Sequence, residues 1–142
     1  MRQTIDDYWQ GQLAALKKRS VAIQPIRGVG GIVYDESPYS GIVDVRLWFN
    51  DNATLDVFEH VEVPESGIPQ RNLYSYHFRA SGREMRWDFD PDLPKDLQHH
   101  INRTSPFGKP LHMPAERISL VAVTEECWDM LAELNDSEGT SD

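Results

Sequence analysis

Two alternating runs of residues flank the dipeptide Ser81-Gly82, and this segment constrains the fold more than any other part of the chain. Ser-Gly is typical of a two-residue turn between antiparallel strands. A turn there pairs His77 with Arg86 and separates two faces. One face is apolar or aromatic, with Tyr74, Tyr76, Phe78, Met85, Trp87 and Phe89; the other is polar, with Ser75, His77, Arg79, Glu84, Arg86 and Asp88. The pattern predicts a hairpin over residues 74–90 with one face against a core.

Two further alternating runs precede this hairpin, over residues 42–50 and 54–63. A three-residue turn between them keeps their apolar faces together, with Leu47 near Leu55 or Val57. Glu59 is the exception, because it falls on the apolar face. Either a bulge turns it outward, or it points inward and needs a hydrogen-bond donor, since burying an unpaired carboxylate is costly.

Helical patterns lie near both ends of the chain. Residues 4–19 form an amphipathic pattern that Thr4 can cap. Residues 117–123 are typical of a strand, after which Thr124 can cap a second helix. Short strands are expected within residues 21–41, and a short helix over 95–102. We therefore predict an α+β domain, with a mainly antiparallel sheet of about five or six strands flanked by an N-terminal and a C-terminal helix. It spans residues 1–135, and residues 136–142 form an acidic tail expected to fray.

Composition narrows the classes of partner. The net charge is −9 and the pI about 4.9, which argues against broad adhesion to nucleic acids or anionic membranes, although a local basic pocket can still bind RNA. Lys17, Lys18 and Arg19 are the only compact cationic cluster. No run of about 18 apolar residues occurs, so no membrane association is expected. Cys127 is the single cysteine, and a chain without a disulfide fits the reducing cytoplasm.

The polar face of the hairpin has two interpretations. It can be a half-exposed sheet with cross-strand ion pairs. Alternatively, His77, Arg86 and Asp88 can face a cleft, where the imidazole exchanges protons and the guanidinium holds a phosphate. His99 and His100 add two imidazoles in the proline-rich segment that follows. Because they are adjacent, at most one of them faces a given site.

The motif "YSYHFR…G…MRWDFD…HHI" resembles the TumE-like family of toxin–antitoxin system toxins, over roughly residues 41–102. The matching residues are Tyr74, Tyr76 and His77 in the first strand, Arg86, Trp87 and Asp88 in the second, His99 and His100 in the loop, and Glu59 in the preceding strand. The resemblance implies a small toxin that is neutralised by a cognate antitoxin protein.

A metal-independent ribonuclease mechanism is one activity that this resemblance suggests. One of His77, His99 and His100 would take the 2′-hydroxyl proton of RNA, and another would protonate the leaving oxygen. Arg86 would stabilise the charged phosphate, and Asp88 or Glu59 would orient a histidine. No cofactor and no metal site are predicted.

Two alternatives remain open at the level of sequence. The domain can be a non-enzymatic interaction module that uses an aromatic sheet face or edge, for which Trp48, Phe58 and His60 provide a mixed surface. It can also be a metal-dependent hydrolase that uses His99 or His100 with Asp88 or Asp90. Convergence of the predicted residues in a pocket would favour an enzyme, and scatter across an exposed sheet would favour an interaction module. The sequence predicts no oligomeric state.

Overall fold

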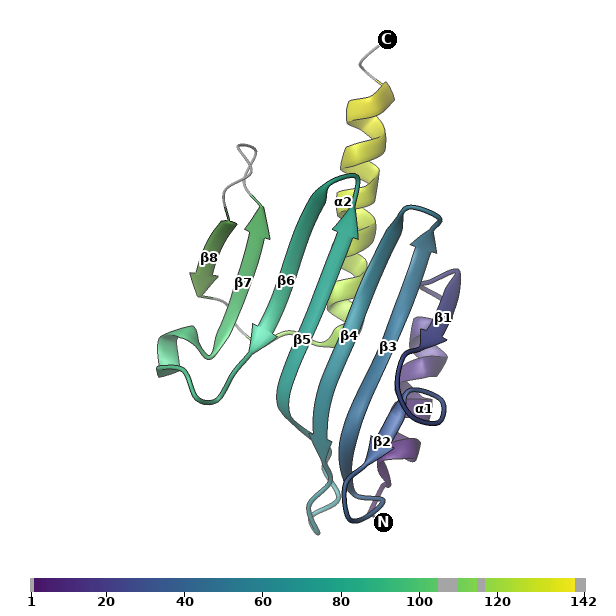
Figure 1. The fold of residues 1–142 in the computed structure, drawn as a ribbon, viewed down its shortest axis with the longest axis vertical. Helices are drawn as coiled ribbons and strands as arrows, with labels where there is room; N and C mark the ends of the chain where they lie inside the picture. The colour runs from purple at the N-terminus through teal and green to yellow at the C-terminus, as the bar shows by residue number, and fades with distance from the viewer. Residues whose placement is uncertain (1, 105–109, 115–116, 140–142) are drawn as a thin grey trace.

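The computed structural model describes residues 2–104, 110–114 and 117–139. Within these residues, eight antiparallel strands lie between an N-terminal and a C-terminal helix (Figure 1). The elements are α1 (Ile5–Leu16), β1 (Ala22–Pro25), β2 (Ile32–Tyr34), β3 (Ser40–Asn50), β4 (Ala53–Glu62), β5 (Gln70–Ala80), β6 (Arg83–Phe89), η1 (Lys95–Leu97), β7 (His99–Thr104), β8 (Pro110–Pro114) and α2 (Leu120–Gly139). The predicted α+β class is confirmed, with more strands than the sequence indicates.

The sheet follows the order β1-β3-β4-β5-β6-β7-β8, and β2 pairs with β3 beside β1. From β3 onward each strand therefore pairs with the next in the chain, without crossovers. Helix α1 packs against β2 and β3, α2 packs against β5, and the two helices contact each other. In Figure 1 both helices lie behind the sheet. We call this side the covered face and the opposite side the open face.

The predicted strand registers are confirmed. In the β5–β6 hairpin, His77 lies opposite Arg86. Ser81 and Gly82 have φ angles of 51° and 76°, the left-handed values that a two-residue turn of this kind requires. Between β3 and β4, Leu47 lies opposite Leu55 as expected, but the predicted three-residue turn is wrong: only Asp51 and Asn52 connect the strands, and an irregularity between Trp48 and Asn50 keeps the faces matched. The alternating apolar residues therefore all fall on the covered face, where they form the core.

Helix α1 closes the core at one side of the sheet. Thr4 caps it as predicted: its Oγ1 accepts from the Asp7 backbone N–H, and its own N–H donates to the Asp7 carboxylate, both at 3.1 Å. Ile5, Trp9 and Leu16 are buried against the sheet. The helix ends at Leu16, earlier than expected.

The predicted strand over residues 117–123 is wrong, because α2 already begins at Leu120. Ser119 caps this helix, since its Oγ accepts from the Ala122 backbone N–H at 3.2 Å. Thr124 lies inside the helix, where its hydroxyl donates to the Val121 carbonyl at 2.6 Å. Leu120, Val123 and Cys127 are buried at helical spacing, so packing overrides the β-branched composition of this segment.

The helix predicted over residues 95–102 is also wrong beyond its first turn. Only η1 is helical there, and β7 follows it at once. Strand β7 pairs with β6, and β8 pairs with β7. This pairing satisfies the backbone N–H and C=O groups of a polar segment whose alternation of apolar and polar residues is weak.

Helix α2 runs to Gly139, into the segment expected to be a tail, and residues 140–142 lie outside the described part. Neither described helix combines the length and hydropathy that crossing a membrane requires.

Candidate functional site

The alternation of strand residues divides the six predicted site residues between the two faces. His77, Arg86, Asp88 and His100 lie on the open face, whereas Glu59 and His99 lie on the covered face. The adjacent histidines point to opposite sides because both belong to β7, where His99 lies opposite Phe89 and His100 opposite Asp88. The predicted residues therefore do not form one site.

On the open face, Asp88 joins an arginine to a histidine. The Arg86 Nε donates to Asp88 Oδ2 at 2.7 Å, and His100 Nε2 lies 3.3 Å from the same oxygen. The other ring nitrogen of His100 lies 2.8 Å from the Leu97 carbonyl oxygen. His100 is buried, and both of its nitrogens face protein oxygens. This ring thus links η1 and β7 to β6, and neither nitrogen is left for a substrate.

His77 belongs to a network of cross-strand ion pairs on the same face. Arg79 donates to His77 Nδ1 at 3.2 Å, and Glu84 lies 3.8 Å from His77 Nε2. Arg79 also lies 3.4 Å from Glu84 and 3.6 Å from Asp56, which binds Arg46 at 2.6 Å. Burial, followed by the Arg79 charge, lowers the pKa of His77. This geometry fits the interpretation of a half-exposed sheet with paired charges.

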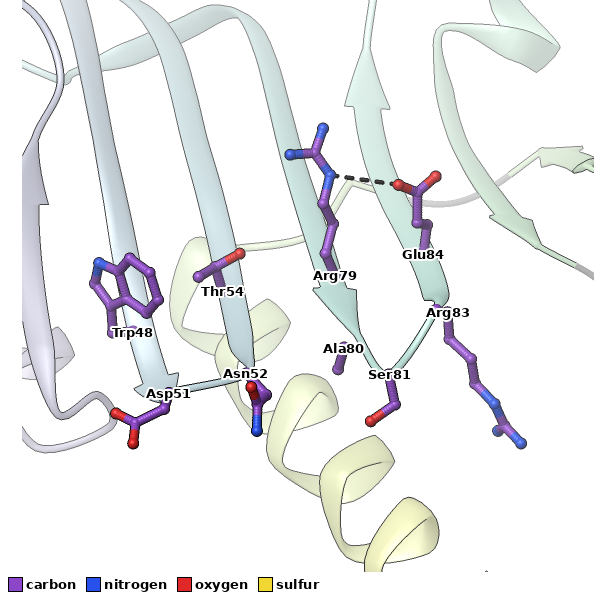
Figure 2. A pocket seen from close by; sticks show the side chains of 10 residues that line it. Trp48, Asp51, Asn52, Thr54, Arg79, Ala80, Ser81, Arg83 and Glu84 are labelled. Atoms are coloured by element: carbon purple, nitrogen blue, oxygen red, sulfur yellow. Dashed lines mark ion pairs between the residues drawn. The ribbon is translucent and has the colours of Figure 1, made fainter.

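A shallow hollow of about 370 Å³ lies at the turn end of the open face (Figure 2). Trp48 and Thr54 lie on one side of it, and the Arg79–Glu84 ion pair lies on the other. None of the six predicted site residues lines this hollow. It is therefore distinct from the site that the sequence predicts.

On the covered face, Glu59 is completely buried in the middle of the sheet. It points inward because the irregularity in β4 falls later, between His60 and Val61. The Tyr8 hydroxyl donates to Glu59 Oε1 at 2.6 Å, and the Tyr76 hydroxyl donates to Oε2. These hydroxyls are the donors that an inward carboxylate needs. Burial raises the pKa of Glu59, although both tyrosine hydrogen bonds and the Arg71 charge act in the opposite direction.

Arg71 supplies the positive charge nearest to this carboxylate. Its Nη1 donates to the Tyr76 hydroxyl at 2.7 Å, so Tyr76 links Arg71 to Glu59. The guanidinium carbon lies 4.6 Å from the centre of the Tyr74 ring. Tyr74 in turn stacks on Tyr76, with 4.9 Å between ring centres. Burial lowers the pKa of Arg71, but Tyr76 and Glu59 more than offset this effect, and the guanidinium stays charged.

His99 lies at the end of this network. Its Nδ1 is 2.9 Å from the Tyr74 hydroxyl, and its ring stacks on Phe89 at 4.4 Å. The Tyr74 oxygen also accepts a hydrogen bond from the Ile118 backbone. Burial, then the charges of Arg117 and Arg71, lower the pKa of His99, so the imidazole is neutral near pH 7. In the described part of the chain, no group binds its Nε2.

These residues form one network, which we call the tyrosine–glutamate cluster: Tyr8, Glu59, Arg71, Tyr74, Tyr76 and His99. It combines a histidine, whose Nε2 has no partner among the described residues, with a charged guanidinium. Such a pair can remove a proton and stabilise an anion. Among the described residues, no group of three or more His, Cys, Asp or Glu side chains is placed to hold a metal ion.

The sequence identified Glu59 and His99 but missed their partners. The sequence did contain a signal for the contact between Tyr8 and Glu59. An inward Glu59 requires a hydrogen-bond donor, and Tyr8 lies on the apolar side of the first helix. Arg71 had no such signal, since it precedes the alternating run of β5 that drew attention to the hairpin.

Comparison with known proteins identifies a family. A family model described as Toxin TumE matches residues 18–135. The match extends beyond residues 41–102 in both directions and includes every strand and most of α2, whereas α1 lies outside it. No curated protein and no solved structure shows a significant match.

Proposed function

We propose that this chain, which belongs to the Toxin TumE family, acts as the toxin of a toxin–antitoxin module by cleaving RNA without a metal ion. Family membership supports the toxin role and a cognate antitoxin partner. The proposal of RNA cleavage rests on one observation: in a half-buried site, His99 has an Nε2 that no described group binds and lies near the charged Arg71. The tyrosine–glutamate cluster, and not the open face, would carry the reaction.

The proposed step begins with proton transfer to His99. Its Nε2 takes the proton of an RNA 2′-hydroxyl, and the 2′-oxygen attacks the adjacent phosphorus. The bond from phosphorus to the 5′-oxygen breaks, which leaves a 2′,3′-cyclic phosphate and a 5′-hydroxyl end. Because His100 faces the opposite side of the sheet, the leaving oxygen takes its proton from a water molecule, and the hydroxide that remains recovers a proton from the His99 imidazolium. The expected pair of histidines is thus replaced by a single histidine and solvent.

Arg71 would bind the phosphate in this reaction. One of its nitrogens binds Tyr76, and its remaining N–H groups have no partner among the described side chains. Guanidinium groups hold phosphate oxygens through such parallel donors. Arg117 is exposed close to His99 and adds a second positive charge. These two arginines would provide the local attraction that a chain of net charge −9 otherwise lacks.

Substitution of His99 tests the proposal, with His77 as a matched control on the other face. His99→Gln should lower RNA cleavage by about 100-fold or more, the usual scale for loss of a general base. It should also relieve growth arrest when the toxin is expressed. His77→Gln should change both readouts less than about threefold, because His77 only joins the surface ion pairs. Cleavage products are measured on a labelled single-stranded RNA.

A second pair of variants distinguishes the two faces further. Arg71→Met should reduce cleavage strongly, whereas Arg86→Met should leave it nearly unchanged, provided that circular dichroism shows both variants folded. The opposite result, with Arg86, Asp88 or His100 essential and His99 dispensable, would assign the activity to the open face.

A non-enzymatic toxin is the second candidate function. The open face places Trp48, Phe58 and His60, all partly exposed, among the paired charges. Such a mixture suits a protein interface. In that case Phe58→Glu would abolish growth arrest, and His99→Gln would have no effect on it.

A further inference from the structure

Exposed apolar side chains gather at one edge of the sheet. Of the seven exposed large apolar residues in the described part of the chain, five lie between residues 21 and 34. These five, which we call the N-terminal edge, are Val21, Ile26, Val29, Val33 and Tyr34. Val29 is 91% exposed and Val21 is 75% exposed. Apolar patches of this kind mark interaction sites more often than scattered single residues do.

Strands β1 and β2 pair only with β3, so both lie at this edge of the sheet (Figure 1), where the neighbours Val33 and Tyr34 point to its two opposite faces. The Ile26 N–H donates to the Asp44 carbonyl at 3.0 Å, and the Asp44 N–H donates to the Gly31 carbonyl at 2.8 Å. The loop between β1 and β2 therefore starts and ends at the same residue of β3. A Cβ atom at Gly28 would lie only 2.9 Å from Val33 Cγ2, so the loop packs against β2.

The charge differs between the two ends of this edge: Asp6 and Asp7 lie near Tyr34, whose pKa is raised by burial and by these two charges, whereas the segment before β1 is basic. Residues 8–34 contain no acidic residue, although the chain has 23. They contain four cations: Lys17, Lys18, Arg19 and Arg27. Arg19 lies 3.6 Å from Glu125, and Arg27 lies 3.0 Å from Asp44. Lys17 and Lys18 are exposed and have no ion-pair partner among the residues that the structure describes. The end of the edge at Val21 is thus apolar and follows two lysines that have no ion-pair partner among the described residues.

We propose that the N-terminal edge binds an acidic segment of the cognate antitoxin through aliphatic anchor residues. Family membership implies the partner, and the edge supplies the matching chemistry: apolar contacts beside lysines that attract carboxylates. The proposal does not depend on RNA cleavage. It involves side-chain contacts more than strand addition, because β1 is short and Pro25 lacks a backbone donor.

Other occupants fit this surface less well. Single-stranded RNA prefers aromatic platforms, and four of the five residues are aliphatic. In a symmetric pair of chains joined through this surface, the lysines of both copies would face each other and repel. An acidic peptide partner satisfies both the apolar and the charged components.

The experiment measures binding of the full-length chain to the protein encoded by the adjacent gene, by isothermal titration calorimetry. Val29→Glu and the double variant Lys17→Glu/Lys18→Glu should each weaken binding at least about tenfold, which is about 1.4 kcal/mol. Ile68→Glu is the matched control, because Ile68 is 68% exposed on the β4–β5 connection, which is not part of the N-terminal edge. It should change the affinity less than about twofold. His99→Gln should bind like the wild type, which separates this proposal from the catalytic one.

Three results would overturn the proposal: no complex with the wild-type chain, edge variants that bind like the wild type, or equal weakening by Ile68→Glu. The same variants are also tested on a single-stranded RNA oligonucleotide and on phosphatidylglycerol vesicles. If the edge variants lose only one of those affinities and keep the antitoxin, the edge instead serves RNA or anionic membranes. Circular dichroism of each variant verifies that the fold is intact.

Discussion

At the scale of single residues, Glu59 is the most unusual feature of the molecule. It is a carboxylate at a core position, where Val57 and Val61 flank it on the same face of β4. A buried carboxylate is tolerated only when hydrogen bonds and an opposite charge replace water. Tyr8, Tyr76 and, through Tyr76, Arg71 provide these. Even so, burial dominates, and the pKa of Glu59 is raised.

A raised pKa predicts how stability depends on pH. Because the folded state holds the Glu59 proton more tightly than the unfolded state, this residue stabilises the fold most below its unfolded pKa of about 4.5. That contribution is lost as the pH rises through the higher folded pKa. Glu59→Gln removes the titration, so its unfolding free energy should increase relative to wild type between pH 4.5 and 8. A tenfold difference in proton affinity between the folded and unfolded states corresponds to about 1.4 kcal/mol.

Urea unfolding of the wild type and of Glu59→Gln across this pH range measures the difference between their unfolding free energies. The other carboxylates are common to both proteins, so their effect cancels in this difference. A wild-type-minus-variant difference that is constant with pH would contradict a raised pKa at Glu59.

At the scale of elements, local patterns predicted β3 to β6 well, but they missed β7 and β8 and misplaced the start of the C-terminal helix. Strand faces follow from a period of two, and a single turn at Ser81-Gly82 is enough to set a register. The start of α2 depends instead on whether Leu120 and Val123 pack on the core as a helix or a strand, which their β-branched neighbours obscure. The Ser119 cap places the first residue of α2 at Leu120.

The helix boundary gives a direct prediction. Ser119→Ala should lower the unfolding free energy by about 1 kcal/mol, because it removes the hydroxyl that caps α2. Thr124→Val should lower the unfolding free energy by less than Ser119→Ala does. The Thr124 hydroxyl donates only to the Val121 carbonyl inside the helix, and valine fills the same volume as threonine. Chemical denaturation of the two variants measures both values. A larger loss for Thr124→Val would support a helix that begins near residue 124.

At the scale of the whole molecule, the candidate site depends on contacts that no local pattern contains. Tyr8 and Glu59 are 51 residues apart, and Tyr74 and His99 are 25 residues apart. The sequence shows that Glu59 needs a donor and that the two adjacent histidines diverge, but it does not show which face each histidine takes. That choice depends on the pairing of β7 with β6, in a segment whose strand character the sequence did not reveal.

Helix α1 raises a question about the cooperativity of the whole fold. It lies outside the residues that match the toxin family, yet it buries Trp9 in the core and donates Tyr8 to Glu59. We predict that α1 unfolds together with the sheet. Gly11 tests this cleanly, because it is exposed in the middle of the helix and a Cβ atom there would meet nothing within 4 Å.

Gly11→Ala should raise the global unfolding free energy by about 0.5–1 kcal/mol, the difference in helix propensity between the two residues. Trp9→Ala should lower it by about 3–5 kcal/mol, the usual cost of removing a buried aromatic side chain. Circular dichroism and tryptophan fluorescence should report the same urea midpoint for each variant. If α1 detaches before the sheet unfolds, Gly11→Ala will leave the fluorescence midpoint unchanged, and the hydrogen bond from Tyr8 to Glu59 will break without global unfolding.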